Sequence, residues 1–215
     1  MFDAPTLPLV NARQMAGARH GLRTVLGAAA WERLPEAVRE RFAEAAGAVD
    51  YAGAFEVVRA SFPGRLFAWL GTLVGTPVAP RTGHHVEARV RVRPNALGVE
   101  WIREYRWSDG CTDCVTSTKV VAGERLVERL PARLCMPLHT YEEGAVLHFV
   151  SLGYYFDLGF GLKLWLPSLL TPGITHVEHI DLAHGWFRFT MTVTHPLLGE
   201  LFFQTGRFCA TGESA

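Results

Sequence analysis

The feature that most constrains the fold of this chain is a two-residue hydrophobic period, which begins near residue 84 and continues toward the C-terminus. In 84–93, one face carries the apolar residues from Val86 to Val92, and the other face is mostly charged. Such alternation is typical of a strand with one face in the core and one in solvent. Short turns separate successive segments, which favours antiparallel neighbours. The predicted strands are 54–61, 84–93, 99–107, 114–121, 125–130, 134–141, 145–157, 174–182, 186–195 and 201–209.

Ahead of this pattern, the chain is predicted to form helices. The segment 14–30 is rich in alanine and arginine, and 34–46 repeats apolar residues at helical spacing. Pro35 suits the first turn of that second helix, because its fixed backbone angle is already helical. A short, very apolar helix is predicted at 64–74, after the first strand.

Together these elements predict a single domain over 1–215, with a helical segment at 1–50 and a curled antiparallel sheet at 51–210. The expected fold class is therefore α+β. A long meander with a helix after its first strand is typical of a lipocalin-like or fatty-acid-binding-like barrel, which can enclose one small ligand. The alternative is a helix-grip half-barrel, in which a bent open sheet holds a helix. Both architectures place an apolar cavity on the concave face of the sheet.

The composition limits the partners of the protein. Lysine plus arginine equals aspartate plus glutamate, at 21 each, which argues against nucleic acid as the main partner. No run of about 18 apolar residues and no export signal is present, so we expect a cytoplasmic protein, with peripheral membrane contact left open. The four cysteines are expected to be reduced. Scarce lysine with abundant alanine and glycine is typical of a GC-rich bacterial genome.

One predicted strand carries an arginine in an aromatic row. Arg103 alternates with Trp101, Tyr105 and Trp107, so it points wherever those rings point. A buried guanidinium without a partner is costly, and Arg103 with Tyr105 could hold a carboxylate. The alternative is that Arg103 lies along the rings with its charged head at the barrel rim. The expected cavity wall consists of Trp101, Phe187, Phe189 and Met191.

Several residues are candidates for acid or base chemistry. His84, His148 and His195 each occupy a polar position in an otherwise apolar row, and imidazole needs little tuning near neutral pH. The alternative is that they are ordinary polar histidines at strand ends. Asp157 ends an apolar strand just before 159–161, a glycine-rich segment that could act as a lid. Its alternative role is that of an exposed turn residue.

Metal and cofactor motifs are weak in this sequence. His176, Glu178 and His179 share one predicted strand, but His179 faces away from the other two, and a metal needs further ligands from neighbouring strands. The Cys111–Cys114 pair has zinc-knuckle spacing without a second pair of ligands. Dinucleotide, phosphate-loop, serine-elbow and zinc-protease signatures are absent. We therefore predict neither a metal nor a cofactor.

Four short motifs carry a resemblance to a known family. The chain resembles an uncharacterised bacterial domain family, whose members are often appended C-terminally to saccharopine-dehydrogenase-like or short-chain-dehydrogenase-like proteins. The resemblance covers 34–208 and implies a domain unit with a dehydrogenase-like partner, here a separate protein. It implies no established activity. The motifs are 101–105 (WIREY), 126–129 (LVER), 164–167 (LWLP) and 196–199 (PLLG).

We therefore expect the protein to bind a small apolar or aromatic molecule, acidic or lipid-like, in an internal cavity. One alternative is a cofactor-independent isomerase, cyclase or hydro-lyase, in which the histidines move protons and Arg103 stabilises an oxyanion. A further alternative is an accessory domain for a separate oxidoreductase, which would dock its partner or a membrane edge through an apolar surface. That surface would include Leu66, Phe67, Trp69 and Leu70.

Overall fold

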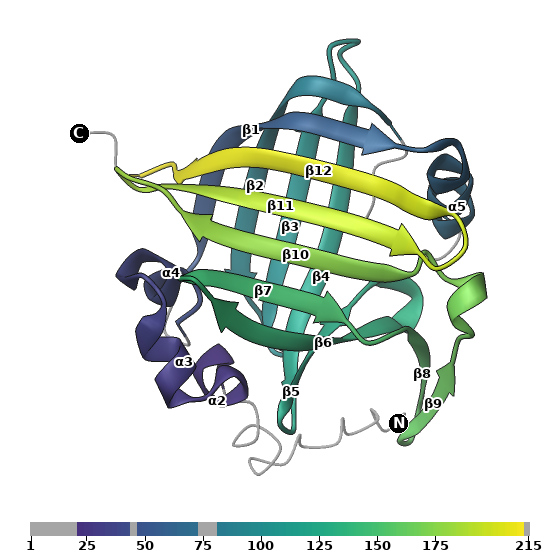
Figure 1. Ribbon diagram of the computed structural model, residues 1–215, viewed down its shortest axis with the longest axis horizontal. Coiled ribbons are helices and arrows are strands. Elements are labelled where there is room, and N and C mark those ends of the chain that lie inside the picture. The colour runs from purple at the N-terminus through teal and green to yellow at the C-terminus, as the bar shows by residue number, and fades with distance from the viewer. Residues whose placement is uncertain (1–20, 44–46, 73–80, 213–215) are drawn as a thin grey trace, which may run out of the picture.

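The computed structural model of the protein describes residues 21–43, 47–72 and 81–212. Within these ranges, twelve antiparallel strands follow the order β5-β4-β3-β2-β1-β12-β11-β10-β7-β6-β8-β9 (Figure 1). The strands are β1 (Val49–Ala60), β2 (Gly83–Pro94), β3 (Val99–Arg106), β4 (Thr112–Ala122), β5 (Arg125–Arg129), β6 (Leu134–Glu143), β7 (Val146–Ser151), β8 (Tyr155–Gly159), β9 (Leu162–Trp165), β10 (Ile174–Asp181), β11 (Trp186–His195) and β12 (Gly199–Ala210).

The sheet closes because β5 also pairs with β6, from Leu126 opposite Leu138 to Arg129 opposite Cys135. Ten strands, β1–β7 and β10–β12, therefore form an antiparallel barrel, while β8 and β9 make a hairpin beside β6. The predicted barrel is confirmed, in a form consistent with a lipocalin-like barrel. The half-barrel alternative is wrong because the pairing of β5 with β6 leaves no open edge between them.

Short helices lie at the two ends of this barrel (Figure 1). They are α2 (Leu22–Leu26), α3 (Ala28–Arg33), α4 (Glu36–Arg41) and α5 (Phe62–Thr72), with the 3-10 turns η1 (Pro131–Arg133) and η2 (Ser168–Leu170). The first three helices pack near one end, whereas α5 packs against β12 and β1 at the other. Strands dominate the described chain, so the α+β label is only loosely correct.

Several element boundaries differ from the sequence-based expectation. Part of the helix predicted at 14–30 lies outside the described residues, and the remainder is broken at Gly27, whose φ of +84° is not helical. The helix predicted at 34–46 is shorter, because α4 begins after Pro35 and ends before Phe42. The first strand is longer than 54–61, since β1 pairs along its length with β2 and β12.

The strand predicted at 145–157 is two strands, β7 and β8. The chain breaks between them at Gly153, whose φ of +121° is unfavourable for residues with a side chain. Tertiary pairing explains the break, because β7 pairs with β10 and the C-terminal part of β6, whereas β8 pairs with the start of β6. No strand was predicted between 157 and 174, but residues 162–165 form β9, which pairs with β8.

Aromatic rings pack against one another in the interior of the barrel. The Phe42 ring enters from the end of α4, with its centroid 5.7 Å from the centroids of both Trp101 and Phe149. Phe55 of β1 stacks on Tyr105 of β3 at 5.0 Å and meets Phe208 at 5.1 Å. Two larger cavities remain among the described residues: one of about 350 Å³ next to α5, and one of about 330 Å³ beside α2 and α4, which Phe42 and Trp101 line.

Helix α5 approaches the barrel closely through a glycine. An added Cβ at Gly64 would lie 2.0 Å from the carbonyl oxygen of Leu201 on β12. That oxygen cannot easily move away, because it accepts a hydrogen bond from the backbone N–H of Ser61 at 2.9 Å. The Ser61 hydroxyl also accepts a bond from the Gly64 N–H, which caps the helix. Glycine at position 64 thus sets the distance between α5 and the barrel.

We expect Gly64→Ala to destabilise the protein by about 1–3 kcal/mol, as overpacking against a fixed backbone atom does. Urea denaturation at neutral pH measures this change. Gly212→Ala is the matched control, since nothing lies within 4 Å of a Cβ added there. Equal stability of the Gly64→Ala variant and the wild type would contradict the close packing of α5.

Candidate functional site

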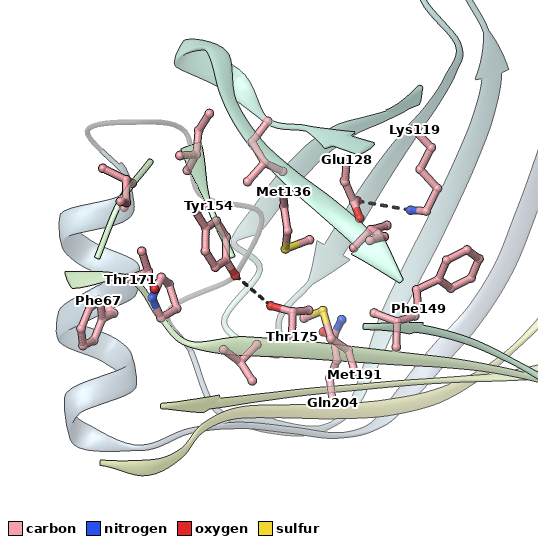
Figure 2. Close-up of a pocket in the computed structure, with 18 of the residues that line it drawn as sticks. Phe67, Lys119, Glu128, Met136, Phe149, Tyr154, Thr171, Thr175, Met191 and Gln204 are labelled. Carbon is pink, nitrogen blue, oxygen red and sulfur yellow. Dashed lines mark hydrogen bonds and ion pairs between the residues drawn. The ribbon is translucent and has the colours of Figure 1, made fainter. Parts of the chain in front are cut away.

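A cavity of about 350 Å³ lies between the barrel wall, α5 and the segment that connects β8 to β10 (Figure 2). Its lining is largely apolar and comes from both sides of the barrel. Met136 and Phe149 belong to β6 and β7, Phe189 and Met191 belong to β11, and Phe67 reaches in from α5. The predicted inward face of β11 therefore contributes to a cavity wall.

Among the described residues that line this cavity, the charged side chains are Arg103, Lys119 and Glu128, from β3, β4 and β5. Lys119 Nζ lies 3.3 Å from Glu128 Oε1, and Arg103 Nη2 lies 3.7 Å from the same oxygen. Arg103 Nη1 also donates a hydrogen bond to Ser117 Oγ at 3.2 Å. About a tenth of each charged side chain is exposed, so two cations share one carboxylate in a dry environment.

Burial and the attraction between opposite charges shift the pKa values of Lys119 and Glu128 in opposite directions. Burial lowers the pKa of Lys119, and Arg103 lowers it further, although Glu128 partly restores it. Burial alone would raise the pKa of Glu128, but Lys119 and Arg103 together hold it below its usual range. The carboxylate is therefore ionised at neutral pH. A second anion in the cavity would favour the protonated form of Lys119 by the same attraction.

Neutral polar groups face the same cavity from other strands. The Tyr154 hydroxyl lies 2.9 Å from Thr175 Oγ1, as the dashed line in Figure 2 shows. Burial raises the pKa of Tyr154 to about 12, so it stays a neutral phenol. Gln204, which is 1 % exposed, accepts a hydrogen bond from the Tyr105 hydroxyl at 3.1 Å. These groups are suited to orient a hydroxyl or carbonyl of a bound molecule.

The predicted ligand-binding residues fall into two groups. Arg103, Phe189 and Met191 line the cavity. Trp101 and Phe187 are buried and do not line it. Trp101 packs on Phe42 and lines the cavity beside α2 and α4, whereas Phe187 packs among other rings of the barrel core.

The predicted carboxylate clamp of Arg103 with Tyr105 is not formed in this structure. Tyr105 is fully buried, stacks on Phe55, and commits its hydroxyl to Gln204. Lys119, rather than Tyr105, is the second donor that lies with Arg103 at the cavity wall.

The three candidate histidines do not converge on the cavity. His84 is exposed at the start of β2, where His85 has a φ of +52° that interrupts the regular strand. His148 lies on the outer face of the barrel, because its neighbours Leu147 and Phe149 point into the core. His148 was expected in an inward row with Val146 and Val150, and this expectation is wrong. The inward row is Leu147 and Phe149, and a shift of one residue along a strand reverses the face of every side chain.

His195 is buried beneath the turn between β11 and β12. Its Nδ1 accepts hydrogen bonds from the backbone N–H groups of Leu197 and Leu198, at 3.1 and 3.2 Å. The ring proton is therefore on Nε2, which donates to the carbonyl oxygen of Leu169 at 3.3 Å. Both nitrogens are occupied by the backbone, so the structure gives His195 a supporting role for two loops.

Asp157 also lies outside the cavity lining. Its Oδ1 accepts a hydrogen bond from the Gly159 N–H at 2.9 Å, and Oδ2 pairs with Arg129 at 3.3 Å. The backbone hydrogen bond from Gly159 is the main reason that the pKa of Asp157 lies below its usual range, with Arg133 and Arg129 adding to it. Asp157 thus stabilises the turn between β8 and β9, where the expected lid segment lies.

Lys119 and Glu128, the two charged cavity residues that pair with each other, were not identified from the sequence as candidate site residues. The signal was present, because Val115, Ser117, Lys119 and Val121 alternate in β4. In β5, Glu128 alternates with apolar residues in the same way. The signal is weaker than it was for Arg103, because the β4 row also holds the polar Ser117 and both rows of β5 carry apolar residues.

Exposed apolar side chains gather on the elements that bound the cavity at its α5 end. Helix α5 presents them as expected, except that Phe67 turns toward the cavity. They include Phe62, Leu66, Trp69 and Leu70 on α5, Phe160, Leu162, Leu164 and Trp165 on the β8–β9 hairpin, and Leu169 and Leu170 on η2. Exposed apolar side chains that gather on neighbouring elements are typical of a surface that contacts another molecule or a lipid surface.

The fold and the site define a class of protein: closed antiparallel barrels with an internal, mostly apolar cavity. Within that class, the chain belongs to the family described as Domain of unknown function (DUF4166), whose model matches residues 34–208. The range agrees with the resemblance drawn from the sequence motifs, while the association with dehydrogenase-like proteins stays a prediction. No curated protein and no solved structure matches the chain. Within the described ranges, no helix combines the length and the apolar character needed to cross a bilayer.

Proposed function

We propose that the protein binds a small amphipathic molecule with an apolar body and an anionic head, such as a carboxylate. The observation that carries this proposal is the Arg103–Lys119–Glu128 cluster on the wall of an otherwise apolar cavity. Two buried cations with one carboxylate favour a second anion, which would form charge-assisted hydrogen bonds in a low-dielectric site.

The shape of the cavity supports an orientation for this ligand. Lys119 and Glu128 lie at the far side from Phe67 of α5 in Figure 2. The head would therefore lie deep in the barrel, and the apolar body would extend past Met136 and Met191 toward α5. A volume of about 350 Å³ is at the small end of ligand pockets, which span roughly 300–1,000 Å³. A single-chain fatty acid fits this description better than a multi-chain lipid.

Dodecanoic acid and dodecanol, which share a chain and differ in head charge, test the proposal. We expect the acid to bind more tightly by calorimetry, and Lys119→Met to weaken acid binding about tenfold or more, since bonds to charged groups contribute about 1.5–3 kcal/mol. The alcohol should be much less affected. Lys163→Met is the matched control, because Lys163 is the other lysine of the chain and does not line the cavity. Equal binding of acid and alcohol would sink the proposal.

The exposed apolar surface around α5, β9 and η2 supports uptake of the ligand from a lipid surface. Trp69 and Trp165, both more than half exposed, are residues typical of membrane interfaces. Peripheral membrane contact is therefore part of the proposal. A dehydrogenase-like protein partner remains a prediction from the resemblance alone.

A cofactor-independent enzyme in the same cavity is the alternative function. The three histidines offer it no support, since none of them lines the cavity. Proton transfer would instead use Lys119 and Glu128, which are 3.3 Å apart. The lowered pKa of Lys119, caused mainly by burial, is the observation that favours this alternative.

A further inference from the structure

A second cluster of functional side chains lies on the outer wall of the barrel. His148 of β7 pairs directly with Glu178 of β10, and His176 is two residues from Glu178 on the same strand. All three side chains therefore share one face. That face is the outer one, because Leu147 and Phe149 on either side of His148 point into the core.

The potential ligand atoms of this cluster are close together. His148 Nδ1 lies 3.1 Å from His176 Nε2 and 3.7 Å from Glu178 Oε1, and His176 Nε2 lies 3.9 Å from the same oxygen. Zinc binds nitrogen and oxygen at about 2.0–2.2 Å, so two atoms of a tetrahedral site are about 3.3 Å apart. Shifts of a few tenths of an ångström would bring the three atoms into that arrangement.

We propose that His148, His176 and Glu178 bind a divalent transition-metal ion of the zinc type, with a fourth coordination position open to solvent. Two imidazoles and a carboxylate suit such an ion, whereas calcium and magnesium prefer more oxygen ligands. Access is open from outside, since about a third of the His176 and Glu178 side chains is exposed. The site is separate from the apolar cavity, which none of the three residues lines.

Surrounding contacts hold the ligands in place. The Tyr141 ring stacks on His148 with centroids 4.6 Å apart and planes within 9°. The His148 ring also has a hydrogen bond with the backbone of Glu143. Outer hydrogen bonds of this kind orient metal-binding imidazoles. The ligands come from two directly paired strands, which position side chains more accurately than loops do.

A hydrogen bond between the two imidazoles would explain their own 3.1 Å contact without an ion. It does not explain Glu178, whose carboxylate is 3.7 and 3.9 Å from the two nitrogens. These separations are too long for hydrogen bonds, and they exceed the spacing of about 3.3 Å in a tetrahedral site by only about 0.4 and 0.6 Å. A change at the Glu178 carboxylate therefore distinguishes a metal site from a hydrogen bond between the two imidazoles alone.

Calorimetric titration with zinc chloride tests the site. Untagged protein with Cys111→Ser and Cys114→Ser removes two exposed thiols that could bind zinc themselves. We expect one equivalent of zinc to bind. Glu178→Gln and His176→Ala should each lower the zinc affinity about tenfold or more, because each variant removes a ligand. His139→Ala is the matched control, because this exposed histidine stacks on Tyr141 outside the cluster.

X-ray absorption at the zinc edge provides a second readout, with nitrogen and oxygen ligands and no sulfur expected. Circular dichroism confirms that each variant is folded, and Glu178→Gln preserves the shape of the side chain in case His176→Ala is unstable. Absence of saturable zinc binding would overturn the proposal. So would affinity that is unchanged in Glu178→Gln, or lowered equally in His139→Ala.

Discussion

Replacement of Glu128 by alanine is expected to lower the free energy of unfolding by about 3–5 kcal/mol, the usual cost of breaking a buried ion pair. The variant leaves Arg103 and Lys119 side by side in an apolar wall without their shared carboxylate. Lys119 can lose its proton, but Arg103 cannot, so one buried charge remains with only the Ser117 hydroxyl as a described partner. Urea denaturation at pH 7 measures the loss.

A surface ion pair provides the control for this variant. Glu87 lies 3.5 Å from Arg106, and both side chains are more than 60 % exposed. Glu87→Ala should therefore change stability by no more than about 1 kcal/mol. Similar changes in the two variants would contradict the view that the cavity cluster is desolvated.

The contribution of Glu128 also has a definite pH dependence. The folded-state pKa of Glu128 lies below the unfolded value, which is about 4.3 for glutamate. Its stabilisation is therefore present above that unfolded value and is lost as the pH falls through the lower folded pKa. The stability difference between wild type and Glu128→Ala should accordingly shrink in acid.

Phe55→Ala is expected to cost about 3–5 kcal/mol, because it removes a large ring from the centre of the barrel. The side chain is 1 % exposed. Its ring centroid lies 5.0 Å from that of Tyr105, 6.2 Å from that of Phe189 and 5.1 Å from that of Phe208. The variant therefore loses apolar burial and three aromatic contacts, and urea denaturation reports the sum.

Phe62→Ala is the matched control for this core variant. Phe62 is 84 % exposed at the start of α5, so its truncation should change stability by about 0.5 kcal/mol or less. A Phe55→Ala variant as stable as Phe62→Ala would contradict the packing of the aromatic core.

Much of the fold follows from local sequence patterns. The alternation around Arg103 predicted a strand whose inner face carries aromatic rings, and the structure places Trp101 and Tyr105 in the core beside it. These inferences succeed because the pleat of a strand sends alternate side chains to opposite faces, whatever the rest of the chain does.

Alternation fails where both faces of a strand are apolar. In β7, Val146 and Val150 form one row and Leu147 and Phe149 form the other, so hydrophobicity cannot say which row faces inward. His148 was assigned to the wrong face for this reason. His195 follows a register shift between Val193 and Thr194, and local irregularities of this kind are not visible in the period.

The sequence by itself determined most of the strands, the face of β3 that Arg103 shares with its aromatic neighbours, and the family to which the chain belongs. Only the tertiary structure decided that β5 closes the barrel on β6, that Lys119 and Glu128 meet Arg103, and that His148 lies opposite Glu178. The physical reason is the range of the interactions. The alternation of apolar and polar residues shows which face of a single strand is buried. A site, in contrast, is formed by side chains from several strands, which become neighbours only when the whole sheet closes.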